Sequence, residues 1–287
     1  MKQIDLLNIG ADVELFVMDR KTKEVISAEG FIKGTKRKPF VFDKLQPDFA
    51  TSLDNVLAEY GIPPATNKVE FYNYLQKGMS FLNQTLPQDL CVAPLPAAIL
   101  DEKYLHTRQA KTFGCEPDFN AYTLNMNPRP TSTNLHLRSA GGHVHVAYNS
   151  PIAIDPDTYM GDEERATIVR ALDLFIGVPS VILEPDNQRK ELYGKAGAYR
   201  PKSYGLEYRT VSNFYLESKR LTYWVYEAVE RAIAWVNSLG VMAEEKIKDL
   251  TKDVQNVVNN NMKSSALRLI EEFNLITDKR LKLAIAA

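Results

Sequence analysis

Three pairs of polar residues, each pair separated by one apolar or aromatic residue, are the parts of this sequence that could do chemistry. The pairs are Asp12 with Glu14, His143 with His145, and Glu207 with Arg209. Side chains two positions apart on a β-strand point to the same face of the sheet. Each pair therefore predicts two polar groups side by side, on a strand whose alternate residues are suited to a core.

Asp12 and Glu14 would place two carboxylates next to each other in the run Ala11 to Val17. Carboxylates that face inward lose hydration and repel one another, and a divalent cation with oxygen ligands offsets both penalties. The pair therefore predicts a metal site. An exposed strand face with solvated acids is the alternative for this pair taken alone.

His143 and His145 follow the glycine pair Gly141 and Gly142, which allows close approach of the backbone. An imidazole can complete a metal shell or donate a hydrogen bond to a phosphate. Satisfied structural histidines on a half-buried strand are the alternative.

A basic, glycine-containing segment extends from Tyr193 to Lys202 and leads into Glu207 and Arg209. Lys195 and Arg200 in this segment are suited to holding phosphate, and Arg209 offers a planar fork for a phosphate or carboxylate. Glu207 is a candidate metal ligand. A basic surface loop with a surface ion pair is the alternative.

Asp54 and Glu59 form a further candidate, but they are five residues apart. Odd spacing puts them on opposite faces of a regular strand. Both reach one site only if Asp54 lies at the start of the strand or a bulge intervenes, so Glu59 is the stronger candidate.

Bulk composition narrows the class of protein. The 287 residues are 45% hydrophobic and 25% charged with a formal net charge of -1, which is typical of a globular protein with no overall attraction to nucleic acid or membranes. Cys91 and Cys115 have no metal-type spacing, and no export signal or membrane span is evident. We expect one domain, residues 1–287, in the cytoplasm.

The elements that must position these residues follow from periodicity and capping. Strands are predicted over 11–17, 121–126 and 143–148. Helices are predicted after Asn67, after Asp162 with an end before Pro179, and from Ser218 to Gly240 within a helical carboxy-terminal part of about 218–287. Strands early and helices late favour an α+β fold with a mainly antiparallel sheet.

The motifs resemble the glutamine synthetase-like superfamily of carboxylate-amine ligases (amidoligases), and within it the phage phiEco32-like COOH.NH2 ligase type 2 group. The segments that carry the resemblance are 10–16, 54–64, 114–118, 141–146 and 193–213. The resemblance implies a glutamine synthetase-like catalytic domain, in which helices pack on the outer face of a curved sheet. It also implies the cytoplasm of the host cell if the protein is phage-encoded.

The resemblance further implies roles for individual residues. The implied metal ligands are Asp12, Glu14, Glu59, His143 and Glu207, and Asp54 is kept as a further candidate metal ligand. The implied phosphate-binding catalytic cations are Lys195, Arg200 and Arg209, and additional substrate or phosphate contacts are assigned to Arg138, His145 and Arg189. The implied cofactors are ATP and Mg²⁺, with Mn²⁺ as an alternative metal.

The implied reaction joins a small-molecule or peptide carboxylate to an amine through an acyl phosphate. This route requires no covalent enzyme intermediate, in keeping with the lack of an evident nucleophile motif. Two alternatives stay open: a metal-dependent phosphoryl-transfer or hydrolytic enzyme, and a catalytically silent nucleotide-binding protein. The carboxy-terminal helices leave a symmetric homo-oligomer contact open as well.

Overall fold

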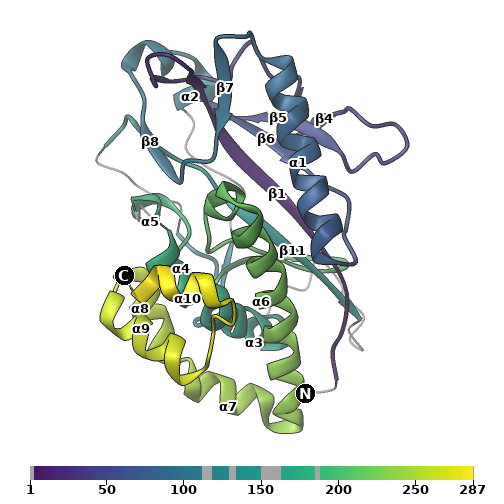
Figure 1. Cartoon of the computed structure of the whole chain (residues 1–287), viewed down its shortest axis with the longest axis vertical. Helices are drawn as coiled ribbons and strands as arrows, with labels where there is room; N and C mark the ends of the chain where they lie inside the picture. Colours follow the sequence, from purple (N-terminus) through teal and green to yellow (C-terminus); the bar gives the residue numbers. More distant parts are fainter. Residues whose placement is uncertain (1–2, 112–117, 129–133, 150–162, 185–187, 287) are drawn as a thin grey trace.

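The computed structural model describes residues 3–111, 118–128, 134–149, 163–184 and 188–286 (Figure 1). Its main element is an 11-stranded sheet, with the order β3-β4-β5-β6-β1-β11-β13-β12-β9 and with β2 and β7 also paired to β1. The strands of this sheet are β1 (Asp5–Asp19), β2 (Val25–Ile26), β3 (Gly34–Thr35), β4 (Lys38–Val41), β5 (Ala50–Asp54), β6 (Leu57–Gly61), β7 (Leu90–Ala93), β9 (Phe119–Asn120), β11 (Gly142–Asn149), β12 (Ala198–Lys202) and β13 (Gly205–Tyr208). A separate two-stranded sheet joins β8 (Ala97–Ile99) to β10 (Leu137–Ser139).

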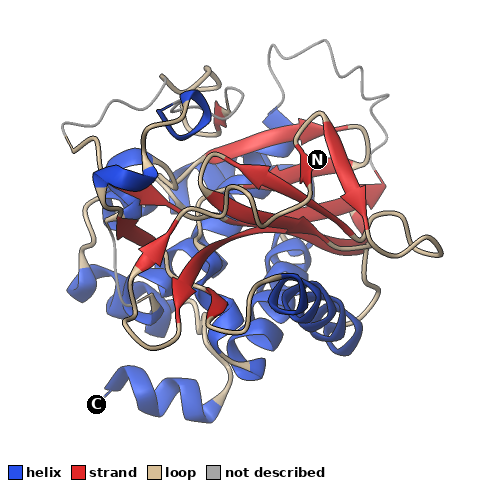
Figure 2. Ribbon diagram, turned by 90° about the horizontal axis from the view of Figure 1, so that it is seen from above, coloured by secondary structure: helices blue, strands red, loops and turns tan. Residues whose placement is uncertain are grey.

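Most helices lie beneath one face of the large sheet, as Figure 2 shows. The α-helices are α1 (Lys68–Thr85), α2 (Arg108–Lys111), α3 (Glu163–Leu172), α4 (Val178–Leu183), α5 (Arg189–Leu192), α6 (Lys219–Ser238), α7 (Ala243–Leu250), α8 (Val254–Asn259), α9 (Lys263–Glu272) and α10 (Lys279–Ala286). Apart from β3 with β5, the paired strands are antiparallel. The predicted α+β class, with an antiparallel sheet and helices on its outer face, is confirmed.

Strand β1 is the long central strand to which both halves of the sheet are paired. Its first half pairs with β11, its middle with β6, and its last residues with β7 and β2. Ala11, Val13 and Leu15 are buried in the main core between the sheet and the helices, as their alternation predicts. Phe16 faces the other way and packs in a second, smaller core with residues such as Leu57 and Leu100.

Two helices begin where capping residues predict. Asn67 accepts hydrogen bonds from the backbone N–H groups of Val69 and Glu70 at the start of α1. Ser218 likewise accepts one from Leu221 at the start of α6, and Gly240, with φ of 57°, follows the end of that helix. The carboxy-terminal part is helical from α6 to α10, as predicted.

Two sequence predictions are wrong. Residues 121–126 form turns rather than a strand, because the Asn120 side chain accepts a hydrogen bond from the Tyr122 N–H (2.9 Å) and Leu124 adopts φ of 57°. The helix that begins with α3 does not end before Pro179. It widens into a π-helical segment, Asp173–Gly177, and continues as α4, so the irregular segment accommodates the missing N–H of Pro179. Asp162, its predicted cap, lies outside the described residues.

The resulting helical run Glu163–Leu183 is long and apolar enough, by composition, to cross a membrane. However, 89% of its most apolar window is buried inside the protein, as in a central core helix. Helices α3 and α6 pack against each other, and α3 also contacts β13. This run therefore forms the floor on which β13 lies. The extent of the single domain, residues 1–287, stays a prediction.

Candidate active site

The register of the sheet brings the predicted polar pairs together on the face opposite the helices. Asp12 on β1 lies directly across from His143 on β11, and His145 lies across from Glu207 on β13. The His143 Nδ1 is 3.0 Å from Asp12 Oδ1 and 3.6 Å from Glu207 Oε1. Asp12, His143 and Glu207, which we call the first triad, offer ligand atoms that all lie within 4.8 Å of one another.

The protonation states in the first triad suit a divalent cation. Burial raises the pKa of Asp12, but His145 and His143 outweigh this effect and hold that pKa well below its usual range. Burial and the charge of Arg209 lower the pKa of His143, which favours the neutral imidazole that ligates metals. Glu207 is completely buried, and Arg209 helps to lower its pKa against the effects of burial and Asp12. Two carboxylates and a neutral imidazole form a donor set that fits Mg²⁺ or Mn²⁺.

A second triad lies beside the first and consists of Glu14, Asp54 and Glu59, whose ligand atoms also lie within 4.8 Å of one another. Glu14 on β1 is directly opposite Glu59 on β6. Glu14 Oε2 accepts a hydrogen bond from the Gly141 N–H (2.5 Å), and Glu59 Oε2 accepts one from Ser52 Oγ (2.6 Å). Backbone and hydroxyl donors thus fix the orientation of two of the three carboxylates.

The second triad holds more negative charge than its surroundings compensate. Burial and the nearby charges of Asp12 and Asp54 raise the pKa of Glu59 to about 8. Burial and Glu14 raise the pKa of Asp54 to about 6. Carboxylates that are buried side by side release this strain when a hard divalent cation binds them, so the residues present fit a second metal ion.

The placement of Asp54 corrects the argument from odd spacing. Asp54 and Glu59 are not on one regular strand but on β5 and β6, which form a tight hairpin through Asn55 at φ of 55°. In this hairpin Ser52 pairs with Glu59, and Asp54 lies two residues from Ser52 on the same face. Reversal of the chain, not a bulge, brings both acids to one site.

Three cations surround Glu207. Arg209 forms an ion pair with Glu207 and lies just past β13, where its N–H donates to the Ala198 carbonyl. Arg200 Nη1 is 3.3 Å from Glu207 Oε1, and Lys202 Nζ is 2.8 Å from Glu207 Oε2. Lys202 was not among the predicted site residues, although its position two residues after Arg200 on β12 is a signal for the same face.

The other predicted basic residues lie elsewhere. Lys195 is exposed on the turn before β12 and does not line the cavity, so its contact with phosphate stays a prediction. Arg138 is buried and donates to three main-chain carbonyls, those of Ala110, Leu135 and Leu137. These bonds hold the loop beside β10.

Arg189 is also buried and donates to the carbonyls of Arg209 (3.1 Å) and Thr210 (2.8 Å). The structure thus gives Arg138 and Arg189 bracing contacts with the backbone and places neither among the residues that line the cavity. For Arg189 the braced segment is the one that carries Arg209. The direct substrate contacts expected of both arginines stay predictions.

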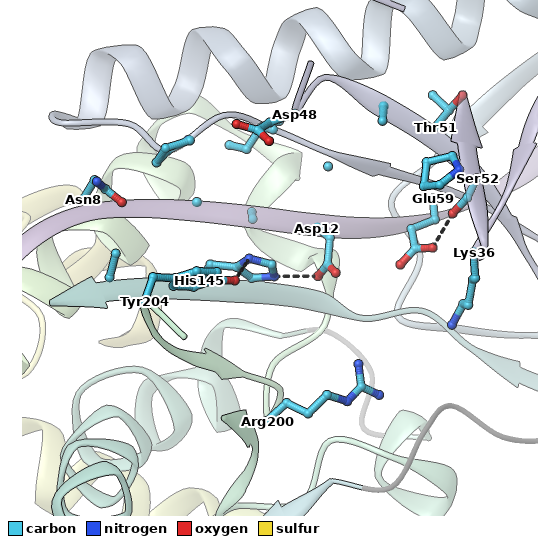
Figure 3. Close-up of a pocket in the computed structure, with 18 of the residues that line it drawn as sticks. Asn8, Asp12, Lys36, Asp48, Thr51, Ser52, Glu59, His145, Arg200 and Tyr204 are labelled. Atoms are coloured by element: carbon cyan, nitrogen blue, oxygen red, sulfur yellow. Dashed lines mark hydrogen bonds and ion pairs between the residues drawn. The ribbon is translucent and has the colours of Figure 1, made fainter. Parts of the chain in front are cut away.

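A cavity of about 850 Å³ adjoins the two triads (Figure 3). Its lining includes small residues at neighbouring positions of the sheet, namely Gly10, Ala50, Gly61 and Ala147. Because these residues leave the space above the strands empty, a substrate can approach the backbone there.

Polar groups face this cavity from several strands. His145 Nε2 is 3.3 Å from Asp12 Oδ1, and its Nδ1 is 2.8 Å from the Tyr204 hydroxyl. Figure 3 shows these residues on one side of Asp12, with Glu59 and Lys36 on the other and Arg200 below. Lys36 was missed by sequence reasoning, because only the pairing of β3 and β4 with β5 carries it to the site.

Comparison with known proteins gives one family match. The model of the family described as phage phiEco32-like COOH.NH2 ligase-type 2 matches residues 125–239. This segment contains His143, His145, Arg200, Glu207 and Arg209, while the acids of β1, β5 and β6 lie outside it. Comparison with curated proteins gives no match.

Solved structures show weak similarity. A bifunctional glutathione synthetase from Pasteurella multocida is 13% identical, with a TM-score of 0.41, over 98% of this chain and 51% of its own. A novel glutamine synthase homolog is 13% identical, with a TM-score of 0.40, over 99% and 68%. A complex of GmaS with ADP is 9% identical, with a TM-score of 0.36, over 98% and 73%. The chain spans about half the length of the first of these proteins.

The resemblance found in the motifs is thus confirmed by the family match over the part of the chain that carries the two histidines and the Glu207–Arg209 pair. Residues 125–239 of this chain are thus similar to the phage phiEco32-like COOH.NH2 ligase-type 2 family.

Proposed function

We propose that this protein is an ATP-dependent ligase that joins a carboxylate to an amine, with Mg²⁺ or Mn²⁺ bound at the two triads. One observation carries the proposal: six acids and imidazoles from five strands form two adjacent metal-type clusters beside a cavity and three cations. The family match supports the ligase class, and ATP dependence is the part that we infer.

The residues of the two triads would bind the metal ions. Asp12, His143 and Glu207 would hold one metal ion, and Glu14, Asp54 and Glu59 would hold the other. Bound divalent ions would neutralise the charge of a triphosphate at this position.

Arg200, Arg209 and Lys202 would orient the γ-phosphate. These three cations contact Glu207. With a metal ion bound to the Glu207 carboxylate, the remaining N–H donors of the three side chains would be left to bind phosphate oxygens.

The reaction would proceed in two displacements. An oxygen of the substrate carboxylate attacks the γ-phosphorus, the bond to ADP breaks, and an acyl phosphate forms. The amine then attacks the acyl carbon, the carbon–oxygen bond to phosphate breaks, and the amine proton leaves as the amide forms. Positioning and charge neutralisation would supply most of the rate enhancement, which agrees with a site built from ligands and cations.

The test is product analysis by mass spectrometry after incubation with ATP, Mg²⁺ and pools of candidate acids and amines. We expect an ATP-dependent mass that corresponds to loss of water between one acid and one amine. Glu207→Ala should abolish this product, because Glu207 belongs to the first triad and binds all three cations. Glu191→Ala, which changes an exposed glutamate on α5, is the matched control and should retain activity.

Other outcomes would favour other functions. Consumption of ATP that needs neither an acid nor an amine would indicate a phosphoryl-transfer or hydrolytic enzyme. Binding of Mg-ATP without turnover on any acid and amine panel would indicate a silent nucleotide-binding protein. Full activity of Glu207→Ala would remove that residue from the metal site.

We infer that the substrates are small molecules or peptides, because the cavity of about 850 Å³ is of the size that holds such ligands. A cytoplasmic location, in a host cell if the gene is carried by a phage, and a homo-oligomeric assembly are also proposals. Fractionation and size-exclusion chromatography would test these two points.

A further inference from the structure

Lys36 places a positive charge in the second triad. Its Nζ is 2.5 Å from Asp54 Oδ2, and the side chain also lines the cavity. The Lys36 side chain is 44% exposed, whereas that of Asp54 is 17% exposed. The carboxylate is thus largely enclosed, while the lysine side chain is half-exposed. Figure 3 shows Lys36 on the same side of Asp12 as Glu59.

The backbone that carries Lys36 is tightly held. Gly34 adopts φ of 92°, and a Cβ at this position would lie 2.3 Å from the Thr51 carbonyl oxygen and 2.5 Å from the Phe40 nitrogen. Only glycine therefore permits this close approach of β3 to its neighbours. Thr51 also donates its hydroxyl to the Lys33 carbonyl at 3.0 Å. The contacts anchor the β3–β4 hairpin on β5, so Lys36 reaches Asp54 from a defined position.

A lysine ammonium group and a divalent cation would bind the same carboxylate oxygens of this cluster. Asp54 cannot hold both at short distance without the two positive charges repelling each other. The lysine side chain is long, flexible and half-exposed, so it can swing away while the hairpin stays in place. The two cations are thus alternatives at Asp54.

We propose that Lys36 is a resident cation of the second triad that a divalent metal ion must displace, and that it thereby weakens metal binding there. This inference rests on the proposed function only in that the triad binds a divalent cation. Lys36 keeps three crowded carboxylates partly neutralised in the metal-free protein. Displacement leaves the ammonium group at the wall of the cavity, which it already lines.

The test measures binding of Mn²⁺ alone, by electron paramagnetic resonance of the free ion, and needs no substrate or turnover. Lys36→Met should bind Mn²⁺ at the second triad about tenfold more tightly than the unchanged protein does, because the substitution removes the positive charge beside Asp54. Lys36→Arg keeps the charge and should resemble the unchanged protein. Lys38→Met removes an equal charge from the exposed strand β4 of the same hairpin and should have little effect.

A double variant assigns the effect to its site. Adding Glu59→Gln to Lys36→Met should remove the gain, because Glu59 belongs to the second triad. Equal Mn²⁺ affinity of Lys36→Met and the unchanged protein would overturn this inference and leave the proposed ligase function standing. An equal gain in Lys38→Met would also overturn it, since a general charge effect would explain the result. If no variant bound Mn²⁺, both this inference and the proposed metal site would fail.

Discussion

Asp173 provides a test of the electrostatics behind the site. It lies on the π-helical segment, is completely buried, and accepts hydrogen bonds from the Tyr208 hydroxyl (2.8 Å) and the Thr210 hydroxyl (2.9 Å). These two residues flank Arg209 on the side of β13 that faces the helices. Burial raises the pKa of Asp173 to about 7 despite the hydrogen bonds that lower it.

The direction of the pH effect follows from this raised pKa. In the unfolded chain the pKa is near the ordinary value of 3.8, so between pH 4 and pH 7 the folded protein holds the proton more strongly. The contribution of Asp173 to the free energy of unfolding therefore falls as the pH rises through this window, and it stays low above pH 7. For a single group with these two pKa values, the linkage relation gives a loss of roughly 2–3 kcal/mol between pH 5 and pH 8.

Substitution of Asp173 by Asn should remove this loss. The amide oxygen of asparagine can still accept the hydrogen bonds from Tyr208 and Thr210, but the side chain does not titrate. In urea denaturation, the stability of Asp173→Asn relative to the unchanged protein should rise by roughly 2–3 kcal/mol from pH 5 to pH 8. Any pH-independent effect of the amide cancels in this comparison.

The exposed Asp253 offers a matched control, because Asp253→Asn changes the same groups outside the core. Its relative stability should be the same at both pH values. If the relative stability of Asp173→Asn is likewise the same at pH 5 and pH 8, the buried carboxyl does not titrate as argued. The reasoning about its environment would then be refuted.

Two further predictions concern the helix that packs beneath β6. Gly78→Ala should lower the melting temperature, because its Cβ would lie 2.2 Å from the ring of buried Tyr60, which is held by a 2.9 Å hydrogen bond to the Leu75 carbonyl. The cost of overpacking, about 1–3 kcal/mol, exceeds the gain of about 1 kcal/mol in helix propensity. An unchanged melting temperature would contradict this prediction. Asn67→Ala should destabilise the protein by about 1 kcal/mol in urea denaturation through loss of the α1 cap, whereas Asn67→Ser, which retains a capping oxygen, should lose less.

The local features of the fold could be read from the sequence. Alternation in 11–17 and 143–148 predicts β1 and β11, and Asn67 and Ser218 predict the starts of α1 and α6. These signals are local because a strand exposes alternate residues and a helix start needs a side-chain acceptor. The predictions of secondary structure were wrong where several local preferences competed. The alternation in 121–126 gave way to turns, and Pro179 was accommodated by a π-helical segment.

The candidate site likewise combines features that local spacing predicts with features that depend on long-range strand pairing. Spacing of two was enough to predict which residues of β1, β11 and β13 share a face, because that spacing follows from strand geometry alone. The type of each side chain also predicted metal and phosphate chemistry. Which acids meet, however, depends on strand pairing across long stretches of chain, such as Asp12 with His143 and Glu14 with Glu59.

Tertiary structure alone decided the rest of the site. The β5–β6 hairpin brought Asp54 to Glu59, and the β3–β4 hairpin delivered Lys36, although neither contact has a signal in local spacing. Packing against the backbone turned Arg189 toward the Arg209 and Thr210 carbonyls. The sequence by itself determined the donor groups and the faces they share. Only the folded sheet decided how these groups divide into two triads, because register and hairpin reversal are set by long-range pairing.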